Sequence, residues 1–142
     1  MQDFVHLHVH TQYSLLDGQA SVARLVDKAM KNGMKGIAVT DHGNMFGIKE
    51  FTNYVNKKNS GPKGEVKDLK KRIAGIEAGT IECADKEAEI AACKAKIVEA
   101  ENKLFKPVIG CEMYVARRTM DLKEGKPDQS GYHLIVLAKN EK

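Results

Sequence analysis

Three histidines, His6, His8 and His10, alternate with apolar residues near the start of the chain. Side chains at positions i, i+2 and i+4 of a β-strand share one face, so this spacing predicts a strand over residues 4–10 with an imidazole face. A row of imidazoles costs stability unless something binds to it, and divalent metals bind neutral imidazole nitrogen well. The segment therefore predicts a metal site.

Further metal-binding residue types follow other expected elements. Asp17 lies in a polar turn, His42 follows an apolar run, and Glu112 and His133 lie in two later strand-like segments. In α/β barrels, functional groups gather at the carboxyl ends of strands and in the adjoining loops, so we expect these side chains to converge. Four imidazoles and two carboxylates are too many for one tetrahedral ion and indicate two or more ions. Mixed nitrogen and oxygen donors favour zinc, manganese or iron. The predicted ligands are His8, His10, Asp17, His42, Glu112 and His133.

Each of these residues, taken alone, has an ordinary structural explanation. A single buried histidine such as His133 is usually a hydrogen-bonded core residue, and Glu112 is compatible with an ion pair in a strand. Asp17 is compatible with a simple turn, and Asp41 with a helix cap. The metal hypothesis depends on their combination with the paired histidines of the first strand.

The elements expected to position these residues form an α/β pattern. Ser21 is a candidate N-cap for a helix with an apolar stripe, and Gly33 is its candidate C-cap. The order strand–helix–strand–helix is typical of parallel α/β architecture, and the whole resembles half of a barrel, as expected for part of a longer protein. Strands are predicted at 4–10, 36–40, 107–115 and 132–138, with a second helix around 48–55.

The segment at about 57–106 differs from its surroundings. Apart from Lys57 and Lys58, it holds ten Lys/Arg and nine Asp/Glu, and its apolar residues repeat at coiled-coil spacing in two separate registers. One helix of about 40 residues would separate its ends by about 60 Å, whereas the flanking strands must return to one sheet. We therefore expect an inserted antiparallel helical hairpin, its charges forming a solvated face or a partner-binding surface.

Composition narrows the class of protein. The 142 residues carry a net charge of +4, with 42% hydrophobic and 30% charged residues, which suits one globular domain. No apolar run approaches the roughly 20 residues that cross a bilayer, and the chain start does not resemble a secretory signal. Three cysteines form neither a paired framework nor a Cys-x-x-Cys motif. We expect a cytoplasmic protein that does not bind membranes.

Four motifs, in order along the chain, resemble a known family. They read FVHLHVHTQYSLLDG, GMKGIAVTDHGNMFG, KPVIGCEMYVA and YHLIVLAKNE. The pattern of the first two resembles the PHP (polymerase and histidinol phosphatase) metal-dependent phosphoesterases. The full spelling resembles the polymerase branch of that family, the N-terminal PHP domain of the alpha (catalytic) subunits of bacterial DNA polymerase III. The resemblance covers residues 3–56 and 106–141.

The resemblance implies a fold and a ligand set. The fold is a distorted (βα)7 barrel, of which residues 1–142 would form an incomplete N-terminal part with about four strands and the hairpin at about 57–106. The family site has nine ligands; six match the residues predicted above, and three fall on later strands. His6 occupies a position that holds Asp in many non-polymerase members. We therefore expect His6 to support the ligands. Metal ligands also need hydrogen-bonding partners that orient them, and Thr11 and Asp41 are candidates for that role.

The resemblance also implies an activity. Family members hydrolyse phosphoesters with two or three divalent ions, and polymerase members with intact ligands act as 3′–5′ exonucleases suited to proofreading. The implied partners are DNA, the rest of a DNA-directed DNA polymerase chain, a proofreading exonuclease subunit and a sliding clamp. Two alternatives stay open: a docking or structural PHP module without hydrolysis, and a stand-alone phosphatase for a small phosphate monoester. The 142 residues alone are expected to be a weak or inactive hydrolase.

Overall fold

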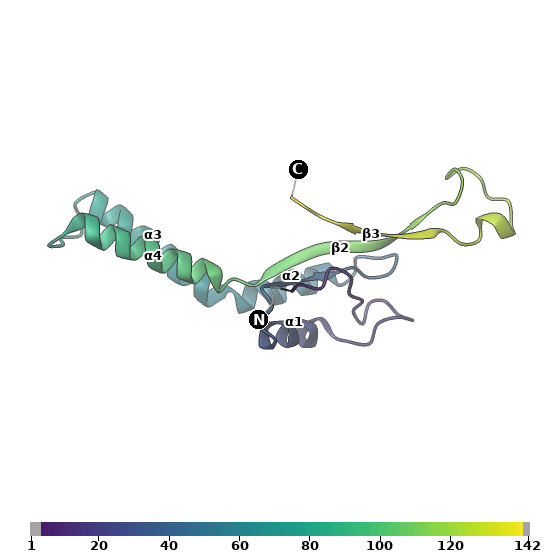
Figure 1. The fold of residues 1–142 in the computed structure, drawn as a ribbon, viewed down its shortest axis with the longest axis horizontal. Coiled ribbons are helices and arrows are strands. Elements are labelled where there is room, and N and C mark those ends of the chain that lie inside the picture. The colour runs from purple at the N-terminus through teal and green to yellow at the C-terminus, as the bar shows by residue number, and fades with distance from the viewer. Residues whose placement is uncertain (1–3, 141–142) are drawn as a thin grey trace. The chain divides into compact units, whose positions relative to one another are not determined.

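The computed structural model describes residues 4–140, which divide into two units. An α/β unit comprises the residues up to Val55 together with those from Lys106 onward, and a helical unit comprises Asn56–Phe105. Figure 1 shows the elements of both. Within the described residues, every helix is too short or too polar to cross a membrane.

The first helix, α1 (Val22–Lys31), begins and ends at the predicted caps. The Ser21 side chain accepts a hydrogen bond from the Arg24 N–H. Gly33, at φ 76°, donates its N–H to the Met30 carbonyl, and the next residue donates to the Ala29 carbonyl. This pair of bonds is a Schellman motif, which satisfies the last carbonyls of the helix.

The sheet has three strands in the order β1-β2-β3, with bounds Gly36–Val39, Lys106–Val115 and Tyr132–Leu137. β1 is buried along its whole length and pairs in parallel with β2. α2 (Ile48–Lys58) adds Phe51 and Val55 to the core of the α/β unit. Both strands of the parallel pair therefore end at the same edge, where the polar residues lie.

β3 departs from the expected parallel arrangement, because it pairs antiparallel with β2. A parallel pair needs a crossover connection, usually a helix. The connection from 116 to 131 contains only the one-turn 3-10 helix η1 (Lys126–Asp128), so the chain returns as a hairpin. His133, near the start of β3, pairs with Tyr114 near the end of β2. The reversal thus keeps His133 at the polar edge.

Residues 4–10 do not form a regular strand, so that prediction is wrong and the described residues hold three strands instead of four. The segment still lies beside β1: Ala38 donates its N–H to the His6 carbonyl and Thr40 to the Val9 carbonyl. The Val9 N–H, however, donates to the Thr40 hydroxyl at 2.9 Å, which interrupts the backbone ladder. The backbone bends at residues 7 and 8, and Leu7 stays 51% exposed.

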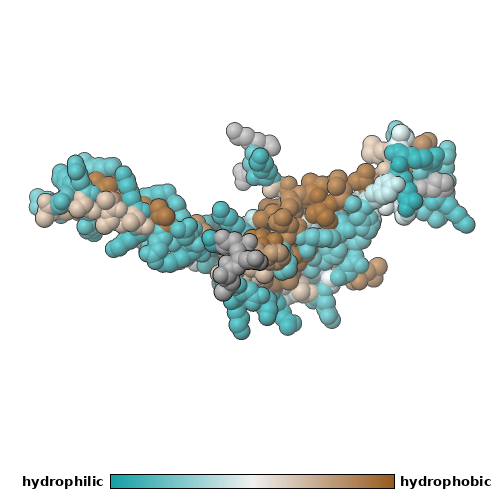
Figure 2. Space-filling model, in the orientation of Figure 1, coloured by the Kyte–Doolittle hydropathy of each residue, from teal (hydrophilic) through white to brown (hydrophobic). Residues whose placement is uncertain are grey.

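One face of the β2–β3 hairpin is apolar and exposed. The register places Met113 opposite Leu134 and Val115 opposite Tyr132, and all four side chains are exposed. Figure 2 shows a hydrophobic surface over these two strands. Because side chains alternate along a strand, Glu112 lies on the opposite face. The two faces therefore separate an apolar surface from the polar residues.

The helical unit consists of α3 (Ser60–Glu77) and α4 (Lys86–Asn102). Arg72 bonds to Glu89 near the turn, and Asn59 bonds to the backbone of Phe105 at the open end, so the helices run antiparallel. The helices occupy the positions that the apolar spacing predicts. None of the predicted seam residues is exposed: Val66, Leu69, Ile73, Ile76, Ile90, Cys93, Ile97, Ala100 and Leu104.

Candidate metal centre

A buried carboxylate, Glu112 on β2, lies at the centre of the site. Its Oε2 is 2.8 Å from His8 Nε2 and 2.6 Å from His10 Nε2, and its Oε1 is 2.7 Å from His133 Nδ1. The Glu112 side chain is 7% exposed, whereas that of His8 is 52% exposed. Three segments that are distant in the sequence therefore meet at one carboxylate.

The environment of Glu112 keeps it ionised. Burial alone would raise its pKa, but hydrogen bonds from His8, His10 and His133 outweigh burial and lower the pKa to about 2. At neutral pH the group is a carboxylate that accepts hydrogen bonds and can bind cations.

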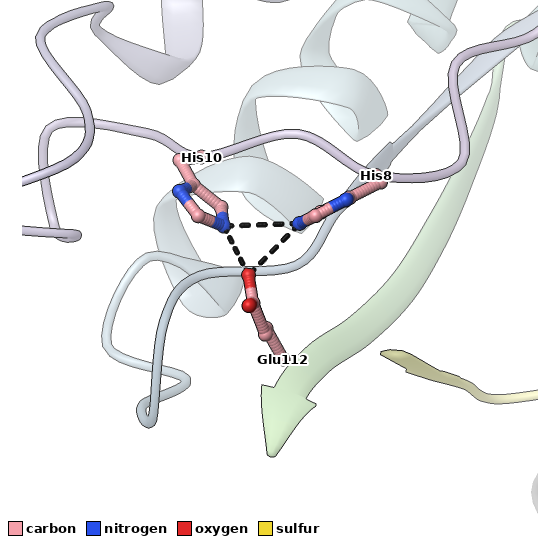
Figure 3. Close-up of side chains that lie close together, drawn as sticks. All are labelled: His8, His10 and Glu112. Carbon is pink, nitrogen blue, oxygen red and sulfur yellow. Dashed lines mark hydrogen bonds and ion pairs between the residues drawn. The ribbon is translucent and has the colours of Figure 1, made fainter. Parts of the chain in front are cut away.

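His8, His10 and Glu112 form a compact triangle of donor atoms (Figure 3). The two Nε2 atoms are 3.2 Å apart. Donors about 2.0–2.1 Å from one tetrahedral ion lie about 3.4 Å from each other, so the triangle needs only a small expansion to surround an ion. Two imidazole nitrogens and one carboxylate oxygen are also donors that suit zinc, manganese or iron. The triangle therefore fits a divalent transition metal.

A second group shares Glu112 with the first. One donor atom each from His42, Glu112 and His133 lie within 4.8 Å of one another. His42 Nδ1 is 2.5 Å from Asp17 Oδ2. Since a carboxylate only accepts, Nδ1 carries the proton, and in neutral His42 the lone pair is on Nε2. That Nε2 is buried and has no hydrogen-bond partner among the described residues, which is the state expected of a metal ligand.

Thr11 and Asp41 shape the loop around the ligands. Asp41 is 1% exposed and accepts hydrogen bonds from the Thr11 N–H at 2.6 Å, the Thr11 hydroxyl at 2.8 Å and the Ser14 hydroxyl at 2.8 Å. Ser14 Oγ in turn accepts from the His42 N–H at 3.0 Å. These bonds tie the loop that leads to Asp17 to the backbone at His42.

His6 lies apart from the other predicted residues. Its ring lies edge-on to Phe4, with centroids 4.7 Å apart, and neither group of donor atoms includes it. The bend at residues 7 and 8 breaks the alternation that would align three imidazoles. The structure thus places five of the six predicted ligands, His8, His10, His42, Glu112 and His133, in the two groups of donor atoms. Asp17 contacts the site only through His42 Nδ1. The ligand roles of all six and the supporting role of His6 stay predictions.

Two residues at the site lack a strong sequence signal. The Tyr114 ring lies 5.0 Å from the His42 ring and 5.2 Å from the His133 ring, and so forms a wall of the site. Its position two residues after Glu112, on the same strand face, is a signal that points to it. Ser14 has no such signal, because a serine in a polar turn is common.

Comparison with known proteins connects this geometry to one family. The PHP domain family matches residues 6–142. DNA polymerase III subunit alpha of Treponema pallidum (strain Nichols) is 37% identical over 139 residues, which cover 97% of this chain and 8% of that protein. The protein of the same name from Borreliella burgdorferi is 38% identical over 141 residues, with the same coverage. That of Aquifex aeolicus is 31% identical over 147 residues, covering 99% of this chain and 9% of that protein. The chain therefore spans less than a tenth of the length of these relatives.

Proposed function

Because the chain belongs to the PHP domain family, we propose that it is the N-terminal metal-binding region of a replicative DNA polymerase III alpha subunit. When the rest of the parent chain completes the site, it hydrolyses phosphodiesters as a 3′–5′ proofreading exonuclease. The observation that supports this most directly is the meeting of imidazoles from separate segments at the buried, ionised Glu112. Nucleotidyl transfer itself belongs to other parts of the parent polymerase.

The two groups of donors would hold two neighbouring ions. His8, His10 and Glu112 would hold one, and His42, Glu112 and His133 the other. Zinc, manganese or iron suits these donors, and ligands from the rest of the parent chain would accommodate a third ion. Bound ions would lower the pKa of a coordinated water and neutralise charge on the phosphate oxygens.

The residues of the chain itself position these groups. Asp17 accepts a hydrogen bond from the His42 Nδ1–H and thereby holds the ring with its unpartnered Nε2 in the interior. In this geometry Asp17 is a positioning residue for His42. Asp41 holds the Thr11–Ser14 turn, and Glu112 joins the remaining histidines, so a substrate phosphate would meet a site whose ligands are already in place.

The surroundings of the site favour a polynucleotide over a small phosphate monoester. A hollow of about 430 Å³ is lined by Asp17 and His42 together with large apolar side chains, among them Leu16 and Phe46. Leu16 is 98% exposed and Phe46 77% exposed. Bases at an unpaired DNA end stack on exposed aromatic rings such as that of Phe46, whereas a small polar ester would leave these apolar side chains uncovered.

A structural role is the second candidate, and one observation favours it. Glu112 connects histidines from three segments of the α/β unit, so an ion bound there would cross-link them and stabilise the fold. In that case the region serves as a docking module for the rest of the polymerase chain, a proofreading exonuclease subunit or a sliding clamp. Either role suits a protein that acts in the cytoplasm.

The test uses the intact alpha subunit that contains this chain. Metal content and release of the 3′ nucleotide from mismatched DNA are measured for the wild type, His8→Ala and Glu112→Gln. Loss of a direct ligand should weaken metal binding by at least about 100-fold and abolish hydrolysis while polymerisation persists. Glu99→Gln, on the surface of α4, is the matched control.

The outcomes separate the candidates. Metal-dependent hydrolysis that disappears in both variants supports the exonuclease. Stoichiometric metal without hydrolysis, together with a lower unfolding temperature after chelation, supports the structural module and refutes the exonuclease. A wild-type protein that binds no divalent ion contradicts both. The 142 residues alone should bind metal but hydrolyse DNA weakly or not at all.

A further inference from the structure

The helical hairpin distributes its charges unequally along the chain. Residues 56–76 hold seven Lys/Arg against two Asp/Glu, a net charge of +5, whereas residues 77–105 hold four against seven, a net charge of −3. The seam between α3 and α4 is apolar, and the ion pairs Arg72–Glu89 and Lys70–Glu101 between the helices account for part of this separation. The positive charge that remains on α3 can attract a polyanion.

The positive charge of α3 is gathered on one face. Lys63, Lys67, Lys70 and Lys71 have the spacing i, i+4, i+7 and i+8, which places them on one side of the helix, and all four are exposed. They line one shallow depression together with Val66 and Ala74, and neither acidic residue of residues 56–76 lines it. We call these four lysines the lysine face.

The lysine face is only partly neutralised within the protein. Lys63 donates to the Asn56 side chain at 2.8 Å, and Lys70 lies 3.9 Å from a Glu101 oxygen, the limit of an ion pair. Within residues 4–140, Lys67 and Lys71 have no salt bridge. Exposed ion pairs contribute little free energy, so these ammonium groups are available to a polyanion.

The residue types on this face select the kind of partner. Protein interfaces are depleted in lysine and depend on aromatic, methionine and arginine anchors, none of which lines the depression. Bidentate contacts to base edges come mostly from arginine, asparagine and glutamine, and binding to single strands depends on aromatic rings for stacking. Lysine instead binds phosphate as a compact point charge. The face therefore suits a phosphate backbone better than base edges.

We propose that the lysine face of α3 binds the phosphate backbone of double-stranded DNA without sequence specificity. Lys63 and Lys71 are eight residues apart, about 12 Å along the helix axis. A DNA duplex carries about one charge per 1.7 Å of its axis, so several phosphates lie within reach of the four side chains. The choice of DNA rests on the proposed function, whereas the binding itself needs neither the metal ligands nor hydrolysis.

The test measures binding of the 142-residue chain to a fluorescent 30-base-pair DNA duplex as a function of NaCl concentration. EDTA is present throughout, so that metal binding and hydrolysis do not contribute. The double variant Lys67→Gln/Lys71→Gln should lower the slope of log K against log salt by about 2, since each lost phosphate contact removes about 0.9. The matched control is Lys94→Gln/Lys96→Gln, which removes the same charge from α4. Circular dichroism checks that the helices persist.

The control should keep the wild-type slope. Because EDTA removes divalent ions, this outcome does not depend on whether the proposed hydrolysis occurs. Equal losses in the two double variants would reduce the effect to net charge and overturn the proposal. Absence of binding at 50 mM NaCl would also overturn it. Tighter binding to polyglutamate than to the duplex would indicate that the positive surface binds an acidic protein, and it would contradict the DNA proposal.

Discussion

The α/β unit and the helical hairpin bury different kinds of side chain. Among the described residues, Thr11, Ser14, Thr40, Asp41 and Glu112 are buried polar groups of the α/β unit. Burial of a polar group costs free energy unless hydrogen bonds compensate for it. Here such hydrogen bonds connect the residues around the candidate metal centre. The hairpin keeps its charges on the surface and buries mainly apolar residues. The buried polar groups of the α/β unit thus surround the candidate metal centre, whereas the charge of the hairpin lies on its surface, where we propose that it binds DNA.

Asn59 is the exception in the hairpin, and its contacts explain it. It is 5% exposed, donates to the Phe105 carbonyl and accepts from the Phe105 N–H at 3.0 Å. The side chain therefore closes the open end of the hairpin as a backbone pair would. This buried polar side chain has a structural role, because both of its hydrogen bonds go to the backbone of Phe105.

The largest expected effect comes from a cavity in the hairpin. Ile76 is fully buried, so Ile76→Ala should lower the free energy of unfolding by about 2–5 kcal/mol. If the hairpin is independent of the metal centre, the affinity for zinc stays at the wild-type value. Urea unfolding followed by circular dichroism and calorimetric zinc titration measure the two quantities.

Val98→Ala is the control for this cavity, because Val98 lies on α4 with 58% of its surface exposed. It should change the free energy of unfolding by no more than about 0.5 kcal/mol. A loss of zinc affinity in Ile76→Ala comparable with that of a ligand variant would break the comparison between the two units.

The second prediction removes a charge from the buried network. Asp41→Asn keeps the shape of the side chain but replaces the Oδ2 acceptor, which faces the Thr11 hydroxyl, with a donor. It also removes the negative charge from the Oδ1 position, which accepts from the Ser14 hydroxyl. The variant should lose about 2 kcal/mol of stability and, because the ligand loop loosens, about 10–100-fold in metal affinity. Thermal unfolding with and without added metal measures both.

Asp68→Asn, at an exposed position of α3, is the matched control and should behave as the wild type. If Asp41→Asn bound metal normally, the buried network would be structural only, and buried polarity would lose its value as a marker of chemistry.

The sequence predicted the elements wherever local signals and packing agree. The caps of α1, the buried run of β1 and the two helical registers each have a local cause that the fold preserves. Five of the six predicted ligands also lie in the two groups of donor atoms, and Asp17 contacts His42 beside them. Side-chain types pointed to these residues, whereas His133 reaches the site from the start of β3 because that strand runs antiparallel to β2.

The remaining features depend on contacts that no local pattern contains. The alternation of residues 4–10 was overridden by the Thr40 hydroxyl, which takes the Val9 N–H that a strand would have used. β3 runs antiparallel to β2 because the connection over 116–131 forms no crossover helix, which a parallel pair would need. The role of Ser14 at the site depends on its hydrogen bond to the buried Asp41, 27 positions away in the chain. It could therefore be recognised only from the folded structure.

The smallest expected effect compares the two helix N-caps. The Asp85 side chain caps α4 by accepting from the Ala88 N–H at 3.0 Å, and its charge also favours the helix dipole. The Ser21 side chain caps α1 through a longer bond, 3.4 Å, at a helix start where Val22 is fully buried. Asp85→Ala should therefore cost about 1 kcal/mol and Ser21→Ala about 0.5 kcal/mol.

Amide exchange at Ala88 and Arg24 measures this difference directly. The physical reason is that tertiary burial holds the start of α1, whereas α4 begins at an exposed turn and depends more on its cap. An equal or reversed order would mean that the hairpin turn is held by something other than local bonds. The seam and the caps of the hairpin would then not be sufficient to explain its stability, and a further contact would be needed.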